Sequence, residues 1–236
     1  MNKSYVREIV LTIVIYVWFL FAATNINIVL GQTYLHFTLG SLALLIIGIT
    51  IFDKKLHITF QKEPGKNFNA ILIGLGGWII LLISSVLVLK FIDPTKASIS
   101  AVINLMGATT PALSASKIAN LLTFGVAIAF IETQLWARML EFFSDLFHIQ
   151  VNKQSLKKFG FLLLIGILSL VFLVFHITAK GVQNLPSLII VFLMMTISLF
   201  IVAYTEETRG AVYLHIFANT VASYILLFSV GGLQLG

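Results

Sequence analysis

The chain of 236 residues is 59% hydrophobic and only 10% charged, with a mean hydropathy of +1.03. A soluble domain carries about 25% charged residues, so this composition excludes an ordinary water-soluble protein. The net charge of +6 does not indicate a nucleic-acid partner. The basic residues cluster between apolar runs, as membrane topology and contact with membrane lipids demand. The sequence has no cysteine, which excludes disulfides and thiolate chemistry.

Apolar segments follow one another along the whole chain and predict an all-α fold, a polytopic transmembrane bundle of about seven spans. The first run follows a basic N-terminus and is interpreted as a retained helix, because a cleaved signal has a shorter apolar core. No repeat divides the chain, so one membrane domain over residues 1–236 is expected. The predicted spans are residues 9–30, 35–52, 70–89, 118–138, 159–177, 187–204 and 211–230.

Basic residues predict the orientation of this bundle, because cytoplasmic loops carry an excess of lysine and arginine. With Met1 inside, eleven of the 15 basic residues fall on the cytoplasmic side and four outside. We therefore expect a cytoplasmic N-terminus, with Gly236 on the far side. The outer set is Lys90, Lys96, Lys117 and Lys180; the inner set is Lys3, Arg7, Lys54, Lys55, Lys62, Lys66, Arg138, Lys153, Lys157, Lys158 and Arg209.

Two connections between the predicted spans have a distinct composition. Residues 93–117 are mildly apolar and contain Pro94 and Pro111, which suits a short re-entrant or interfacial helix, a lid, or a plain loop. Residues 141–158 mix phenylalanines with Asp145 and three lysines. That mixture predicts an amphipathic helix that runs along the cytoplasmic surface.

Ionisable residues inside a span are costly and therefore mark candidate functional sites. Glu132 is the one acidic residue well inside an apolar segment, and His176 and His215 lie within or at the end of two others. Asn219 shares a helical face with His215, as Phe172 does with His176, because each pair is four residues apart. Purely structural roles are the alternative: interhelical hydrogen bonds for the histidines, or a salt bridge between Glu132 and the arginine six residues later.

The candidate residues form a set able to hydrolyse a peptide without a serine or cysteine nucleophile. Glu132 would act on water as a general base. His176 would share the proton or position the water. His215 and Asn219 would donate hydrogen bonds to the developing oxyanion.

These residues resemble the motifs of the CPBP intramembrane proteases, the family of CAAX prenyl endopeptidases and bacteriocin-processing enzymes also called Abi. The family pattern is EExxxR on one helix, FxxxH on the next and HxxxN near the end. The second and third motifs match at Phe172–His176 and at His215–Asn219. The first is read from Glu132, with Thr133 in place of the second glutamate and Arg138 one residue late.

The resemblance covers residues 118–230, which would form a protease-like core with Phe172 and Arg138 in supporting positions. Only Glu132 can carry the role of the water-activating glutamate, because the pair Glu206–Glu207 falls in a turn after the sixth span. Thr133 is expected to contribute little, since it offers no carboxylate. The implied activity is that of an intramembrane peptidase whose substrate is a peptide or protein. A lipidated CAAX end and a leader peptide are two examples, and the sequence does not select among these and other substrates.

The cofactor and the activity itself have alternatives. Glu132, His176 and His215 are enough ligands for a catalytic zinc, but a metal-free site is preferred because Asn219 is a poor zinc ligand. A catalytically impaired relative that acts as a membrane scaffold or immunity-type protein is the second hypothesis, favoured by the degenerate first motif. A transporter with Glu132 as a proton relay is the third.

The predicted span boundaries conflict with a shared site. They place His215 near the cytoplasmic end of its helix and His176 near the outer end of another. At a rise of ~1.5 Å per residue, the two would be some ~20 Å apart in depth.

Overall fold

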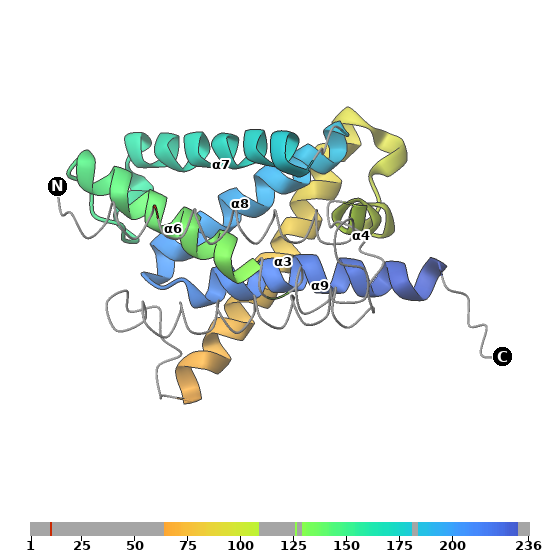
Figure 1. The fold of residues 1–236 in the computed structure, drawn as a ribbon, viewed down its shortest axis with the longest axis horizontal. Helices are drawn as coiled ribbons and strands as arrows, with labels where there is room; N and C mark the ends of the chain where they lie inside the picture. The colour runs from red at the N-terminus through yellow and green to blue at the C-terminus, as the bar shows by residue number, and fades with distance from the viewer. Residues whose placement is uncertain (1–9, 11–63, 109–125, 127–128, 181–183, 231–236) are drawn as a thin grey trace, which may run out of the picture.

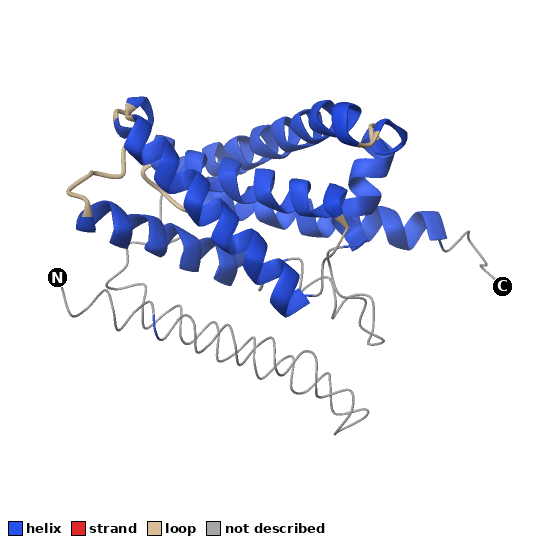
Figure 2. Ribbon diagram, turned by 90° about the horizontal axis from the view of Figure 1, so that it is seen from above, coloured by secondary structure: helices blue, strands red, loops and turns tan. Residues whose placement is uncertain are grey.

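The computed structural model describes residues 10, 64–108, 126, 129–180 and 184–230. The described part of the chain is helical, with no strand, and its helices pack around a common core (Figures 1 and 2). The longer elements are α3 (Pro64–Ile92), α4 (Ile99–Ala108), α6 (Ala129–Leu146), α7 (Phe159–Lys180), α8 (Leu185–Thr205) and α9 (Arg209–Val230). Two short 3₁₀ turns, η2 (Pro94–Lys96) and η4 (Ser155–Lys157), lie in the connections.

Four of the predicted apolar segments are confirmed as helices: 70–89 in α3, 159–177 in α7, 187–204 in α8 and 211–230 in α9. The predicted spans 9–30 and 35–52 lie outside the described residues. Each of the six longer helices contributes side chains to one hydrophobic core. Its fully buried members include Leu81, Leu140, Phe161, Met195 and Leu214.

The predicted boundary after residue 138 and the predicted surface helix over 141–158 are both wrong. Helix α6 continues to Leu146 and then ends in a Schellman turn, in which Ile149 N–H donates to the Ser144 carbonyl (2.8 Å). His148 takes the left-handed conformation that this turn requires (φ 54°). Phe142 and Phe143 thus belong to the last turns of α6, and Phe147 lies in the turn that follows. The lysines beyond them lie in an irregular connection and η4.

The connection over residues 93–117 contains a helix. Helix α3 ends at Ile92, and the carboxylate of the next residue, Asp93, accepts a hydrogen bond from the Thr95 hydroxyl and pairs with Lys96 at 3.3 Å. The Thr95 hydrogen bond lowers the pKa of Asp93. Helix α4 follows and packs against α8 and α9. Because Val102 and Met106 are buried in the common core, α4 is an integral element of the bundle.

Helices α3 and α9 cross at unusually close range, and two glycines make this possible. A Cβ placed on Gly74 would lie 2.4 Å from Tyr213 Cβ and 2.9 Å from the backbone nitrogen of Leu214. A Cβ on Gly210 would lie 2.9 Å from Ile73 Cγ2. The lack of side chains at these positions lets the two backbones approach, and it fixes the position of α9 relative to α3.

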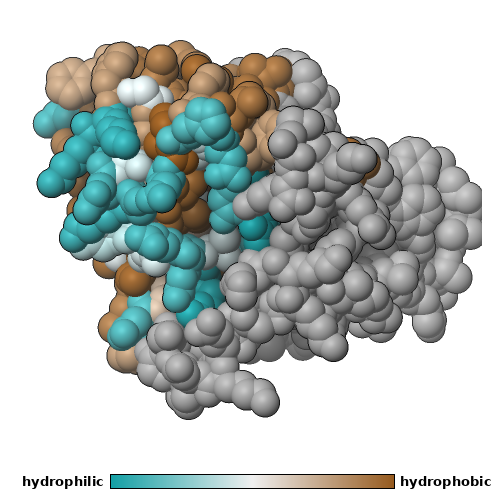
Figure 3. Space-filling model, turned by 90° about the vertical axis from the view of Figure 1, so that its left-hand side faces the viewer, coloured by the Kyte–Doolittle hydropathy of each residue, from teal (hydrophilic) through white to brown (hydrophobic). Residues whose placement is uncertain are grey.

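The surface of the described part divides into an apolar flank and a polar end. Large apolar side chains are exposed at helical spacing along α3 and α7, among them Leu72, Ile79, Ile83, Leu87, Leu163, Ile167, Leu170 and Val174. Hydrophilic side chains gather at the end formed by the α6–α7 connection and the α8–α9 turn (Figure 3). Within α3, Phe68–Ile92 is long and apolar enough to cross a membrane, and so is α8.

Candidate active site

The centre of the candidate site is a contact between Glu132 on α6 and His215 on α9. Both side chains are buried, with exposed fractions of 0% and 1%. Glu132 Oε2 lies 3.4 Å from His215 Nε2. A carboxylate removed from water needs such a partner, because the energetic cost of burying an unpaired charge is high. The structure therefore brings together two residues that the sequence placed on separate helices.

Thr133 also lies at this site, although the sequence predicts little contribution from it to activity. Its side chain is buried, and its hydroxyl oxygen lies 3.2 Å from His215 Nδ1. The same hydroxyl donates to the Ala129 carbonyl at 2.7 Å. Both ring nitrogens of His215 therefore lie near consecutive residues of α6, Nε2 near Glu132 and Nδ1 near Thr133. The signal in the sequence that could have pointed to Thr133 is its position directly after Glu132, the candidate base.

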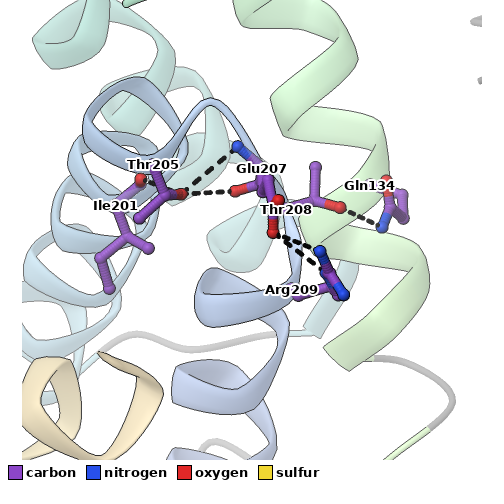
Figure 4. Close-up of polar contacts among 6 residues, drawn as sticks. All are labelled: Gln134, Ile201, Thr205, Glu207, Thr208 and Arg209. Carbon is purple, nitrogen blue, oxygen red and sulfur yellow. Dashed lines mark hydrogen bonds and ion pairs between the residues drawn. The ribbon is translucent and has the colours of Figure 1, made fainter. Parts of the chain in front are cut away.

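The α8–α9 turn is tied to α6 on the side of the site nearer the polar end. Gln134 Nε2 donates to the Thr208 hydroxyl at 2.8 Å (Figure 4). Arg209 Nε and Nη2 both donate to one carboxylate oxygen of Glu207, at 3.0 and 2.7 Å. Within the turn, the Thr205 hydroxyl bonds the carbonyl of Glu207 at 3.0 Å. These contacts fix the start of α9, and hence the depth of His215 six residues later.

Glu206 and Glu207 lie in the α8–α9 turn, as the sequence predicts. Glu206 has a left-handed conformation there (φ 57°), and Glu207 pairs with Arg209. Their positions leave Glu132 as the carboxylate at the buried site.

His176 is reached from Glu132 through two aromatic rings. The Trp136 ring, one turn after Glu132 on α6, meets Phe172 of α7 edge-on at a centroid distance of 5.4 Å. Phe172 in turn contacts the His176 ring at 4.1 Å. Helices α6 and α7 run in opposite directions (Figure 1), so Glu132 and His176 both lie one turn beyond the Trp136–Phe172 contact, away from the polar end.

The imidazole of His176 is buried and anchored to its own helix. Nδ1 lies 3.0 Å from the Phe172 carbonyl, and a carbonyl only accepts hydrogen bonds, so Nδ1 carries the hydrogen. The other ring nitrogen, Nε2, is left as the one able to exchange a proton. The FxxxH spacing therefore supplies both an aromatic contact and an anchor for the ring.

Arg138 and Asn219 take more peripheral positions. Arg138 forms an ion pair with Glu141, three residues later on α6. Asn219 lies one turn after His215 on α9 and is half-buried. Both stay candidates for supporting roles.

The contact between Glu132 and His215 shows that these two residues lie at the same depth of the bundle. The predicted conflict in depth concerns His176 and His215, and their separation stays a prediction.

Zinc is the alternative to a metal-free site. A catalytic zinc takes three protein ligands. Glu132 and His215 supply two facing donors, and no group of three His, Asp or Glu side chains suited to a metal occurs within the described ranges.

Comparison with known proteins gives no relative for this chain. No protein-family model matches it, and no curated protein or solved structure is significantly similar to it.

Proposed function

We propose that the protein is a polytopic integral membrane protein of about seven spans, with a cytoplasmic N-terminus and the C-terminus outside. The apolar stripes of α3 and α7 favour a lipid environment, since this much exposed apolar surface is unstable in water. The α6–α7 connection and the start of α9, which carry the inner-set residues Lys153 and Arg209, lie at the polar end. The α3–α4 connection, which carries the outer-set Lys96, lies at the opposite end (Figure 1). This separation supports the proposed orientation.

We further propose that the protein is an intramembrane endopeptidase of the CPBP type, a CAAX prenyl endopeptidase-like enzyme. The observation that carries this proposal is the buried contact between Glu132 and His215 at 3.4 Å. A carboxylate beside an imidazole in a water-poor site can accept a proton from water and pass it on. The substrate class is a peptide or protein cleaved in or beside the membrane, either lipidated or carrying a leader peptide.

In the proposed reaction, Glu132 takes a proton from a water molecule as the water oxygen attacks the peptide carbonyl carbon. The carbonyl oxygen becomes an oxyanion, and Asn219 donates a hydrogen bond that stabilises it. His176 Nε2 accepts a hydrogen bond from the attacking water and positions it. Collapse of this intermediate restores the C=O bond and breaks the C–N bond. The proton taken from water then passes to the leaving amine, with His215 Nε2 sharing it on the way.

A buried hydrogen-bond donor lies one turn after Glu132 on α6. The indole N–H of Trp136 is buried and has no hydrogen-bond partner among the described residues. A buried donor of this kind costs stability unless a ligand or water meets it. In this proposal it donates to a backbone carbonyl of the bound peptide.

The test is Glu132→Gln, which keeps size and hydrogen bonding but removes proton acceptance. Full-length protein in detergent would be assayed against a panel of quenched fluorescent peptides, including prenylated CAAX ends and leader sequences. We expect turnover to fall about 10²-fold or more. The matched control is Asp145→Asn, which makes the same charge change at an exposed position of the same helix. Equal loss in both variants, or full turnover in Glu132→Gln, would refute the proposal.

A catalytically impaired relative, acting as a scaffold or immunity-type protein, is the second candidate. It is favoured by Thr133, which stands where the family has a second glutamate. Such a protein would keep its cellular function in Glu132→Gln with normal folded yield, because a neutral amide is less costly to bury than a charge. Loss of cellular function at normal yield would instead favour the enzyme.

A further inference from the structure

The hydrogen atoms around His215 can be assigned from the chemistry of its neighbours. The Thr133 hydroxyl has a single hydrogen. At 2.7 Å from the Ala129 carbonyl, which only accepts, that hydrogen points to Ala129. The hydroxyl oxygen therefore faces His215 Nδ1 with a lone pair, at 3.2 Å. For this contact to be a hydrogen bond, Nδ1 must be the donor.

We propose that Thr133 is a positioning residue that locks His215 in the Nδ1–H tautomer. The lock leaves Nε2 facing Glu132 at 3.4 Å, as the nitrogen that exchanges a proton with the carboxyl group. The inference rests on the proposed function, in which Glu132 and His215 work together. It reassigns Thr133 from a degenerate motif position to a functional one.

If Nδ1 of His215 keeps its hydrogen, Glu132 and His215 Nε2 share one proton between them. With Nδ1 already protonated, the 3.4 Å contact is favourable either as Glu132 carboxylic acid with a bare Nε2, or as carboxylate with imidazolium. With the opposite tautomer, the Thr133 oxygen and Nδ1 would face each other without a hydrogen between them. The hydroxyl therefore excludes the Nε2–H tautomer. In that tautomer Nε2 already carries a hydrogen, so neutral His215 could not accept there the proton that Glu132 removes from water.

The second buried histidine of the site is held in the same way, which supports the assignment. His176 Nδ1 donates to the Phe172 carbonyl four residues before it on α7. Both imidazoles thus present Nε2 as the exchanging nitrogen. His176 uses its own helix backbone as the anchor, whereas His215 uses a side chain from α6, so a substitution can remove the anchor of His215 alone.

The primary test is ¹⁵N NMR of the full-length protein labelled at histidine, in detergent micelles. The His215 signals are identified by their loss in His215→Gln. We expect wild type and Thr133→Ser to carry the hydrogen on Nδ1, and Thr133→Val, which keeps the side-chain shape without the hydroxyl, to show a mixture of tautomers. A wild-type His215 protonated only on Nε2 would overturn the proposal before any variant is made. An unchanged tautomer in Thr133→Val would also overturn it.

Peptide hydrolysis gives the second readout. We expect about 10- to 100-fold slower turnover in Thr133→Val, with recovery in Thr133→Ser, because one buried hydrogen bond is lost and then restored. Thr220→Val is the matched control: its hydroxyl donates to the Ile216 carbonyl on the same helix as His215. Full turnover in Thr133→Val overturns the positioning role. If wild type cleaves no peptide but the His215 tautomers in wild type, Thr133→Val and Thr133→Ser are as expected, the proposed peptidase activity is refuted. The proposal that Thr133 fixes the His215 tautomer is then still supported.

Discussion

Replacing Gly74 with alanine tests how the bundle holds His215 in place. The new Cβ would meet Tyr213 Cβ at 2.4 Å, Leu214 N at 2.9 Å and the Gly210 carbonyl at 3.0 Å. Two of these atoms are backbone and cannot rotate away, so helix α9 itself must shift. Overpacking costs about 1–3 kcal/mol, and we expect the upper end here. The helix propensity of alanine returns about 0.5–1 kcal/mol, which leaves a net destabilisation of about 2 kcal/mol.

Gly76→Ala is the matched control, because a Cβ at this position meets nothing within 4 Å. Gly76→Ala should gain the higher helix propensity of alanine without a steric clash. The free energies of unfolding of the two variants should therefore differ by about 3 kcal/mol. The assay is the temperature at which half of the detergent-solubilised protein loses its monodisperse peak, measured beside wild type. We expect Gly74→Ala to fall below wild type and Gly76→Ala to equal or exceed it. Equal midpoints for the two variants would refute the close crossing of α3 and α9.

Three further predictions address the metal, a helix end and the topology. Peptide hydrolysis should survive a zinc chelator; loss of activity that Zn²⁺ restores would replace the metal-free mechanism. His148→Gly should raise stability by about 1 kcal/mol, since glycine adopts the left-handed conformation (φ 54°) without the steric cost of a Cβ; a lower unfolding midpoint would contradict this. Reporter fusions after Lys158 should signal the cytoplasm and those after Lys96 the far side, and the opposite result at either position would reject the orientation.

Several features of the protein follow from the amino-acid sequence alone. The long apolar runs of α3, α7, α8 and α9 are visible in it because a helix buried in, or surrounded by, apolar material must be apolar over most of its length. The relations within single helices are equally local. Four-residue spacing puts Phe172 beneath His176, and the ring contact at 4.1 Å follows from that periodicity. Glu132 could also be singled out, since an acidic residue inside an apolar run is rare.

The contacts between helices were decided by the tertiary structure. Thr133 and His215 are 82 residues apart, and no local pattern tells how deep each lies. Depth depends on where α6 ends, on the Gln134–Thr208 bond that ties α9 to α6, and on the close crossing at Gly74. A shift of one residue rotates a side chain by ~100° around its helix. The partner of Thr133 is therefore set by the offset and tilt of packed helices, which the spacing of residues within one helix does not encode.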